Sequence, residues 1–347
     1  MLRTLMSQSI EIGCWNYIQS TTSLPSQTAA RNFRPREGAR GNQAFFSGFV
    51  ALIHAAVEQK AKTSLSLYFS RKIKPPPAQF FREAHRVYNR QSVRCSVRIL
   101  LLSDIHSNLE ALDACLAAAP AHDLVINLGD TVGYAANPNE VIARVRSLGR
   151  IFVRGNHDKA VSGLMNLDDF NPIAGLATLW TRDQLTPENL EWLRSLPQGP
   201  VRSDELPGLQ FVHGSPFDED EYLVSVRDAV EPLVTDSVPV TFFGHTHLQG
   251  GFVLQGEVSE SYRPGYRTVG QPESSDWPLR PNRRYLINPG SVGQPRDGDW
   301  RAAFATFDTD ARIVTFCRVP YNLSVAQEKI HAANLPQRLA TRLATGR

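Results

Sequence analysis

Seven polar positions in this chain have the residue types and the order along the sequence that a two-metal hydrolytic site requires. The neighbours Asn156 and His157 are counted here as one position. They lie in the segments SDIHSN, NLGD, VRGNHD, FVHGSP and FGHTH, most of which follow a short apolar run. Such runs predict β-strands, and strand ends meet at one edge of a sheet, so distant residues can converge there. The residues are Asp104, His106, Asp130, Asn156, His157, His213, His245 and His247.

The two aspartate motifs can hold cations. Residues i and i+2 of an extended segment point the same way, so Asp104 and His106 can grip one metal ion. Asp130 carries two carboxylate oxygens, and one oxygen per ion would hold two cations about 3.5–4 Å apart. Alone, a D-x-H match is weak, and an isolated Gly-Asp is more often a turn or a helix cap.

The histidine motifs are more specific. The Asn156 amide oxygen can ligate a divalent ion, and His157 can protonate a leaving oxygen or stabilise charge on a phosphoryl group. The alternative for this pair is an Asx turn with a surface histidine. A lone histidine is more often structural, but His213, His245 and His247 all end β-like runs that contain glycine. Mixed ligation of this kind suits Mn, Fe, Ni or Zn better than Ca or Mg.

The elements that must position these residues follow an α/β rhythm. Buried strands are predicted at VRILLLSD and DLVINLGD, and a third strand followed by a turn at RIFVRGNHD, with helices over 108–119 and 138–148 between them. Residues 159–200 are expected to be helical, and LQFVHG and VTFFGHTH to be further strands. Residues 250–285 are expected to form a hairpin and a long loop over the site, and both of these middle regions to wall the pocket. Three closing strands (RRYLINPGSVG, RAAFATFD, ARIVTFCRV) precede a helical segment at 323–347.

The first 96 residues differ in composition from the rest. Residues 1–97 contain 14 basic and 4 acidic residues, a net charge of +10, whereas the whole chain carries +3. We expect a poorly ordered basic extension, or the product of a start codon assigned too far upstream. Nucleic-acid binding by this segment is not expected, because it contains no recognisable module. The predicted domains are therefore 1–96, the motif-bearing domain 97–322, and the C-terminal segment 323–347.

The remaining composition favours a cytoplasmic protein without a membrane span. The longest apolar candidate, 44–57, is interrupted by polar residues and is expected to be a short amphipathic helix. The four cysteines (Cys14, Cys95, Cys115, Cys317) show no CxxC spacing, so a disulfide framework is not expected and a reducing compartment fits.

Taken together and in this order, the motifs resemble those of the calcineurin-like metallophosphoesterase superfamily, above all its small bacterial and archaeal single-domain branch. LLSDIHSN, NLGDTVGY, VRGNHD, FVHGSP, FGHTH and INPGSVGQPR carry the resemblance, which covers roughly 97–320. It implies a four-layer α/β/β/α sandwich and a cofactor of two divalent transition-metal ions, with manganese favoured over iron, nickel or zinc.

The resemblance also implies roles for the residues. Asp104, His106 and His247 would hold the first metal, and Asn156, His213 and His245 the second. Asp130 would bridge the two ions, and His157 would be a catalytic histidine that binds no metal. A hydroxide between the metals would attack phosphorus in line. Asn288, Gly290, Ser291 and Arg296 would lie near the mouth, where Asn288 and Arg296 are candidates for substrate contact; a solvated loop arginine is an equal alternative for Arg296.

The expected activity is hydrolysis of small phosphodiesters. Phosphoprotein phosphatases of this superfamily carry an Asp-Arg-Gly shortly after the bridging aspartate, whereas this chain reads GDTVGYAANPNE, without arginine. Protein phosphatase activity is therefore disfavoured. The alternatives are a phosphomonoesterase or nucleotide phosphatase, which includes dinucleoside polyphosphate hydrolysis, and a metal-retaining scaffold for protein partners. The oligomeric state stays open.

Overall fold

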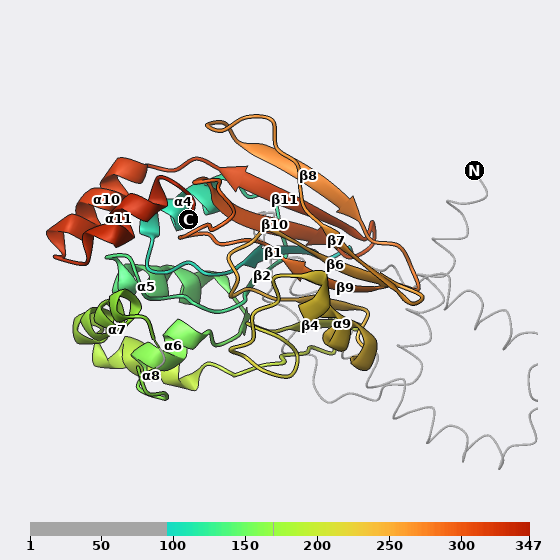
Figure 1. The fold of residues 1–347 in the computed structure, drawn as a ribbon, viewed down its shortest axis with the longest axis horizontal. Helices are drawn as coiled ribbons and strands as arrows, with labels where there is room; N and C mark the ends of the chain where they lie inside the picture. Colours follow the sequence, from blue (N-terminus) through green and yellow to red (C-terminus); the bar gives the residue numbers. More distant parts are fainter. Residues whose placement is uncertain (1–95, 169) are drawn as a thin grey trace, which may run out of the picture. The chain divides into compact units, whose positions relative to one another are not determined.

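The computed structural model describes residues 96–168 and 170–347, which build two β-sheets (Figure 1). The six-stranded sheet has the order β3-β2-β1-β10-β11-β8, with bounds Ile151–Phe152, Leu124–Asn127, Arg98–Leu102, Ala302–Asp308, Ile313–Val319 and Glu273–Pro278. The five-stranded sheet has the order β4-β5-β9-β6-β7, with bounds Leu209–Phe211, Val240–Phe242, Arg284–Asn288, Gly250–Gln255 and Val258–Tyr262.

Helices flank the sheets and begin where the sequence offers a cap. Asparagine side chains cap α4, α7 and α10, while Thr186 caps α8 and Ser225 caps α9, each accepting a bond from a backbone N–H of the first turn. The helices are α4 (Leu109–Ala118), α5 (Pro138–Leu148), α6 (Asn156–Val161), α7 (Pro172–Gln184), α8 (Pro187–Ser195), α9 (Val226–Thr235), α10 (Leu323–Ala332) and α11 (Gln337–Leu343).

Alternation along the strands separates the layers. In β1, Ile99 and Leu101 pack into the core between the two sheets, whereas Leu100 and Leu102 face the helices on the outer side. A third core places α9 residues Ala229 and Leu233 against the outer face of the five-stranded sheet. The predicted four-layer α/β/β/α sandwich is therefore confirmed, with α9 on the opposite side from α4, α10 and α11 (Figure 1).

Parallel pairing brings the ligand-bearing strand ends together. β1, β2 and β3 are parallel in one sheet, and β4, β5 and β9 are parallel in the other. The carboxyl ends of parallel strands lie at the same edge of a sheet, where open α/β proteins place their ligands. β10 pairs antiparallel with β1, and β11 pairs antiparallel with β10, so the six-stranded sheet is mixed.

Two segments differ in part from the structure that the sequence predicts. The strand predicted at the start of RIFVRGNHD spans only Ile151–Phe152, and the turn predicted after it leads into α6, which begins at Asn156. In 250–285 the expected hairpin is present as β6 and β7, but the expected long loop over the site is not, because β8 pairs at the edge of the six-stranded sheet. The extension and the expected helix at 44–57 lie outside the described residues, and the domain boundary at 322 stays a prediction.

The described segments contain no helix that is both long and apolar enough to cross a membrane.

Candidate metal centre

The predicted ligands lie in loops that follow the carboxyl ends of parallel strands. Both sheets contribute: β1, β2 and β3 of one sheet and β4 and β5 of the other. Backbone bonds extend the pairing of β1 and β2 into the loops, with Asp104 N donating to Gly129 O at 3.0 Å and His106 N to Asp130 O at 3.0 Å. The two sheets are joined at the site by Gly293 N, which donates to Asp104 O at 3.0 Å.

Five ligand residues adopt a left-handed backbone that their side chains disfavour. The φ angles lie between 50° and 65° at Asp104, His106, Asp130, His245 and His247. Each such residue costs on the order of 1–2 kcal/mol, so the surrounding structure must impose the conformation. Strain concentrated on the ligands indicates that their placement serves function rather than stability.

Two glycines allow the loops to approach one another. A Cβ on Gly155 would lie 2.1 Å from Asp130 Oδ1, and a Cβ on Gly244 would lie 2.1 Å from Ser103 Oγ. Gly155 has φ of −94°, so alanine would fit its backbone but not its surroundings. The glycines of GNHD and FGHTH are thus required by space, not by backbone freedom.

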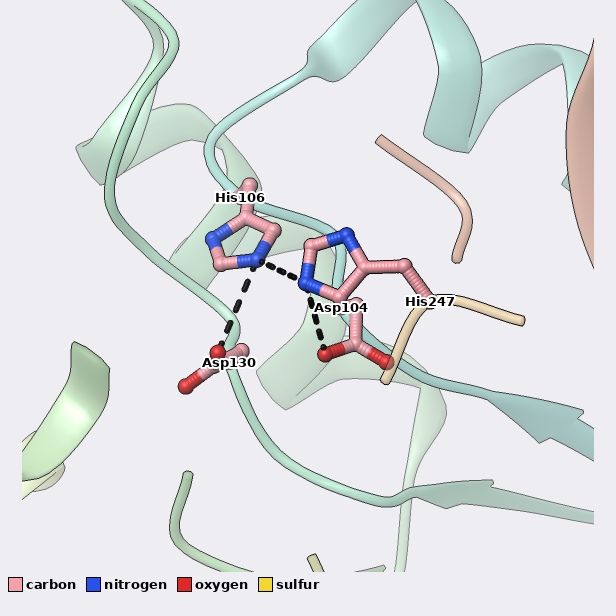
Figure 2. A group of neighbouring side chains, drawn as sticks. All are labelled: Asp104, His106, Asp130 and His247. Atoms are coloured by element: carbon pink, nitrogen blue, oxygen red, sulfur yellow. Dashed lines mark hydrogen bonds and ion pairs between the residues drawn. The ribbon is translucent and has the colours of Figure 1, made fainter. Parts of the chain in front are cut away.

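The first group consists of Asp104, His106, Asp130 and His247, all buried and pointing at one another (Figure 2). His106 Nε2 lies 3.1 Å from His247 Nε2 and 3.5 Å from Asp130 Oδ2. His247 Nε2 lies 3.3 Å from Asp104 Oδ1. Four ligand atoms that converge within such distances form a candidate cation site.

The second group consists of Asp130, His213 and His245, with Asn156 beside them. His213 Nε2 lies 3.5 Å from Asp130 Oδ2 and 3.3 Å from Asn156 Oδ1. The structure therefore brings all seven predicted metal ligands together, in two groups that share Asp130. Asp130 Oδ2 is equally far, 3.5 Å, from His106 Nε2 of the first group and from His213 Nε2 of the second.

The histidine rings are oriented by backbone carbonyls. The Nδ1 atoms of His106, His213 and His247 lie 3.1, 2.8 and 2.5 Å from the carbonyl oxygens of Val132, Leu128 and Gln294. A carbonyl accepts only, so Nδ1 carries a proton and Nε2 points to the centre, where its lone pair would bind a metal. His245 is reversed: its Nε2 lies 3.1 Å from Asp220 O, which leaves Nδ1 as the ligand atom.

The electrostatics of the centre call for a cation. Burial raises the pKa of Asp104 to about 7 and lowers the pKa of His245 to about 3. Burial would also lower the pKa of His213, but the adjacent Asp130 carboxylate raises it to about 10. In the part of the chain that the structure describes, Asp104 and Asp130 form ion pairs with histidines and with no lysine or arginine. Divalent ions fit this donor set, because they would neutralise buried carboxylates that lack a permanent positive partner.

His157 lies beside the centre without joining either group. Its ring lies 4.9 Å from that of His106 and packs edge-on against it, centroid to centroid, and its Nδ1 is buried without a hydrogen-bond partner among the described residues. Burial lowers the pKa of His157 to about 4. An oriented imidazole that does not belong to the ligand set can donate to a reacting oxygen.

The residues expected at the mouth take different places. Asn288 is buried; its Nδ2 donates to Gly244 O at 2.7 Å, and its Oδ1 accepts from Gly290 N at 2.8 Å. These bonds use the side-chain amide of Asn288 to hold the loop that carries His245 and His247. Asn288 therefore does not line the opening. Ser291 is also buried, and its hydroxyl donates to Asp104 O at 2.8 Å. Arg296 does reach an opening, beside Tyr134.

A hollow of about 320 Å³ opens at the second group. Residues of 159–200 form part of its wall, as expected, but none of 250–285 does, because that region pairs into the sheets instead. Sequence reasoning missed Tyr134 and Tyr222, although Tyr134 lies within GDTVGY; no signal marked Tyr222. The hollow is lined by Tyr134, Asn156, His157, Met165, Phe170, Asn171, Ala174, Asp220, Tyr222 and His245.

Sequence reasoning also missed Asp158, the last residue of GNHD. It is buried, and its two carboxylate oxygens accept from Val132 N at 3.2 Å and Gly155 N at 3.1 Å. Because it ties the Asp130 loop to the start of α6, the fourth letter of that motif has a structural use.

Comparison with known proteins agrees with this geometry. The sequence profile of the calcineurin-like phosphoesterase superfamily domain matches residues 97–312. An uncharacterized protein of Methanocaldococcus jannaschii is 37% identical over 253 residues, which cover 72% of this chain and 98% of that protein.

Solved structures share the fold. A metallophosphoesterase from Sphaerobacter thermophilus is 40% identical with a TM-score of 0.62, and the match covers 73% of this chain and all of that one. A hypothetical protein from Pyrococcus horikoshii, 18% identical, has a TM-score of 0.58 over 72% of this chain and 99% of its own; at that identity the likeness concerns the fold alone.

Proposed function

The chain belongs to the calcineurin-like phosphoesterase superfamily, and from this premise we propose that it is a dinuclear metal-dependent hydrolase of small phosphodiesters, with manganese as the favoured metal. The superfamily binds two divalent ions, and its members are generally hydrolases. The residues of the two groups fit such a cofactor by type, burial and orientation.

One observation carries the proposal. Asp130 Oδ2 lies 3.5 Å from a ligand nitrogen of each group, His106 Nε2 and His213 Nε2, so one carboxylate serves both. Its other oxygen accepts from His157 N at 2.8 Å, which fixes the carboxylate and places the His157 backbone beside it. A shared carboxylate is the arrangement that two-metal hydrolysis requires.

The chain's own residues supply binding and proton handling. When bound, the two ions would activate water and polarise the phosphoryl oxygens. Asp104 holds its position through His245 N and Ser103 Oγ, which donate to its two oxygens at 3.2 and 2.7 Å. His157 lines the hollow and would donate a ring N–H to the leaving oxygen or to a phosphoryl oxygen.

The lining of the hollow favours a diester over a monoester. None of the described residues that line it is lysine or arginine, and one is a carboxylate, Asp220. A phosphodiester carries one negative charge, whereas a phosphomonoester carries up to two at neutral pH. The second charge of a monoester would find no fixed positive side chain there, so the singly charged ester is the better fit.

The remaining expectations extend this proposal. We expect a small phosphoester as the partner, with no membrane association and no nucleic-acid binding by the basic N-terminal segment. Among the described residues, Cys115 and Cys317 are free thiols, which supports a reducing compartment such as the cytoplasm.

Hydrolysis of two chromogenic esters tests the proposal. The Mn-loaded chain is assayed with bis-p-nitrophenyl phosphate and with p-nitrophenyl phosphate. Asp130→Asn should abolish metal binding and turnover together, whereas Asp113→Asn, at an exposed carboxylate on α4, should change neither. Preference for the diester supports the proposal, and preference for the monoester would replace it with a phosphomonoesterase. Turnover of neither ester with two metals bound would contradict hydrolysis and favour a scaffold.

A further inference from the structure

Three arginines gather in a second hollow next to the metal centre. Arg296 lies in the loop between β9 and β10, whereas Arg338 and Arg342 belong to α11. Residues four apart on a helix lie on the same face, so α11 presents both guanidinium groups in one direction. The hollow measures about 570 Å³, and its lining includes the three arginines together with Tyr134, Asn171 and Tyr222.

Arg296 and Arg342 are partly buried and Arg338 is exposed, and in the described part of the chain none of the three pairs with an acidic side chain, whereas several other arginines do. Arg154 lies 2.9 Å from Glu219, Arg301 lies 2.6 Å from Asp299, and Arg318 pairs with Asp297. Over the described residues, no aspartate or glutamate forms an ion pair with Arg296, Arg338 or Arg342, and none lines their hollow.

The polar atoms of these arginines are also only partly used. The buried Nε of Arg296 has no hydrogen-bond partner among the described residues, and its Nη2 has only long contacts, at 3.2 Å to Gln294 Oε1 and 3.4 Å to Tyr134 OH. Arg342 uses its Nε on the main-chain oxygen of Arg347 at 2.7 Å. Burial, together with the charge of Arg296, lowers the pKa of Arg342 to about 10. Guanidinium groups that lie close together without an aspartate or glutamate beside them favour binding of an anion.

The hollow of the arginines adjoins that of the metal centre. Tyr134, Asn171 and Tyr222 line both. The Tyr134 ring lies 4.4 Å from the His157 ring, centroid to centroid, and the Cζ atoms of Arg296 and Arg342 each lie 5.9 Å from its centroid. Tyr134 therefore lies between the two hollows, with His157 on one side and the guanidinium groups of Arg296 and Arg342 on the other. We call this ring the Tyr134 partition.

We propose that Arg296, Arg338 and Arg342 bind a second phosphate group of the substrate, so that the substrate is a phosphodiester with a further phosphate beyond the scissile one. Guanidinium groups suit phosphate because their fork of N–H donors matches its oxygens. The Tyr134 partition means that the two phosphates are separated by a spacer, such as a nucleoside sugar, rather than joined directly. This inference names the substrate class of the proposed hydrolase and rests on that function.

Titration calorimetry of the Mn-loaded full chain with two probes tests the inference. The probes are thymidine 5′-monophosphate and thymidine 3′,5′-bisphosphate, which differ by one non-adjacent phosphate. Wild type should bind the bisphosphate at least about tenfold more tightly, the factor expected from one charge-assisted hydrogen bond. In Arg338→Ala/Arg342→Ala the affinity ratio should fall towards one, and Arg338→Lys/Arg342→Lys should keep part of it because the charge remains.

Controls separate this claim from the fold and from the proposed function. Arg227→Ala, at an exposed arginine on α9, should keep the wild-type ratio. Metal content and thermal melting are recorded for each variant. Equal affinities in wild type, an undiminished ratio in the double alanine variant, or an equal loss in Arg227→Ala would each overturn the inference. If the chain binds metals but does not turn over bis-p-nitrophenyl phosphate, the proposed function fails, whereas the affinity ratio still decides whether the arginines bind a second phosphate.

Discussion

At the scale of single residues, the metal centre depends on which ring nitrogen each imidazole leaves free. The backbone carbonyls of Val132, Leu128 and Gln294 accept hydrogen bonds from Nδ1 of three histidines. These bonds turn Nε2 of His106, His213 and His247 towards the carboxylates. The types and order of the ligands are legible in the sequence because D-x-H, GNHD and GHTH each place donors at a strand end. The carbonyl partners are not legible, because a backbone oxygen carries no sequence signal.

His157 should matter for turnover but not for metal binding. His157→Ala removes an imidazole that lies outside both ligand groups. We expect two metals per chain to remain and the turnover number to fall by roughly 10²–10⁴, the range for loss of one general acid. Metal analysis beside steady-state kinetics checks this, and loss of the metals would show that His157 is a ligand instead.

The absence of a side chain at Gly155 should be essential for the position of the Asp130 carboxylate. In Gly155→Ala the new Cβ would lie 2.1 Å from Asp130 Oδ1 and 2.3 Å from Asp130 N, so the Asp130 loop must move. We expect lost metal binding and a decrease of about 1–3 kcal/mol in the free energy of unfolding.

Gly175→Ala is the matched control for this substitution. Gly175 lies within α7, and a Cβ there would meet no atom within 4 Å. Unfolding should become less favourable by about 0.5–1 kcal/mol because alanine is the better helix former, with metal binding unchanged. Denaturant unfolding and metal analysis measure both variants. Full metal occupancy in Gly155→Ala would contradict the tight packing described for the loop.

At the scale of elements, the segment before α9 orients one ligand through ion pairs. Glu219 is buried and pairs with Arg154 at 2.9 Å and Lys159 at 2.8 Å, and Lys159 also holds Asp220 at 2.8 Å. The carbonyl of Asp220 in turn accepts from His245 Nε2. This chain of contacts ties α6 to the second ligand group through the ring of His245.

Glu219→Ala should therefore weaken the second metal selectively. Removing one partner of a buried ion pair costs about 3 kcal/mol, and His245 would lose its orienting carbonyl. Stoichiometry under limiting manganese should fall from two ions towards one. Glu188→Ala removes the partner of Arg146 in an exposed pair and should leave stoichiometry and stability unchanged. Equal loss of both ions in Glu219→Ala would refute the selective coupling.

Strands were predictable from their apolar runs, and helices from the capping residues that precede them. The runs around Leu100 and Ile126 are apolar throughout because both faces of their strands are covered, by helices on one side and by the second sheet on the other. Asn288 misled the prediction because a polar side chain at a strand end can turn inward as well as outward. Arg338 and Arg342 gave no signal, since their use depends on where α11 packs.

At the scale of the whole molecule, the metal centre joins the two sheets. Each ligand group draws residues from both, with Asp104 and Asp130 from the six-stranded sheet and His213, His245 and His247 from the five-stranded one. Metals bound there should stabilise the folded state as a whole, because unfolding separates the sheets and destroys the sites.

Metal removal should accordingly lower the melting temperature. Manganese at about one hundred times its dissociation constant contributes about 2.7 kcal/mol per site, which corresponds to a rise on the order of 5–10 °C for each occupied site in a domain of this size. Calorimetry with manganese and with a chelator measures the shift, and Asp130→Asn should show none. A melting temperature that is independent of manganese would mean that the centre does not bind it.

Anomalous diffraction from manganese-loaded crystals tests the central claim most directly. We predict two peaks about 3.5–4 Å apart, with Asp130 bridging them. One should lie among Asp104, His106 and His247, and the other among Asn156, His213 and His245. A single peak, or two peaks that do not share Asp130, would contradict the dinuclear centre on which the proposed hydrolysis depends.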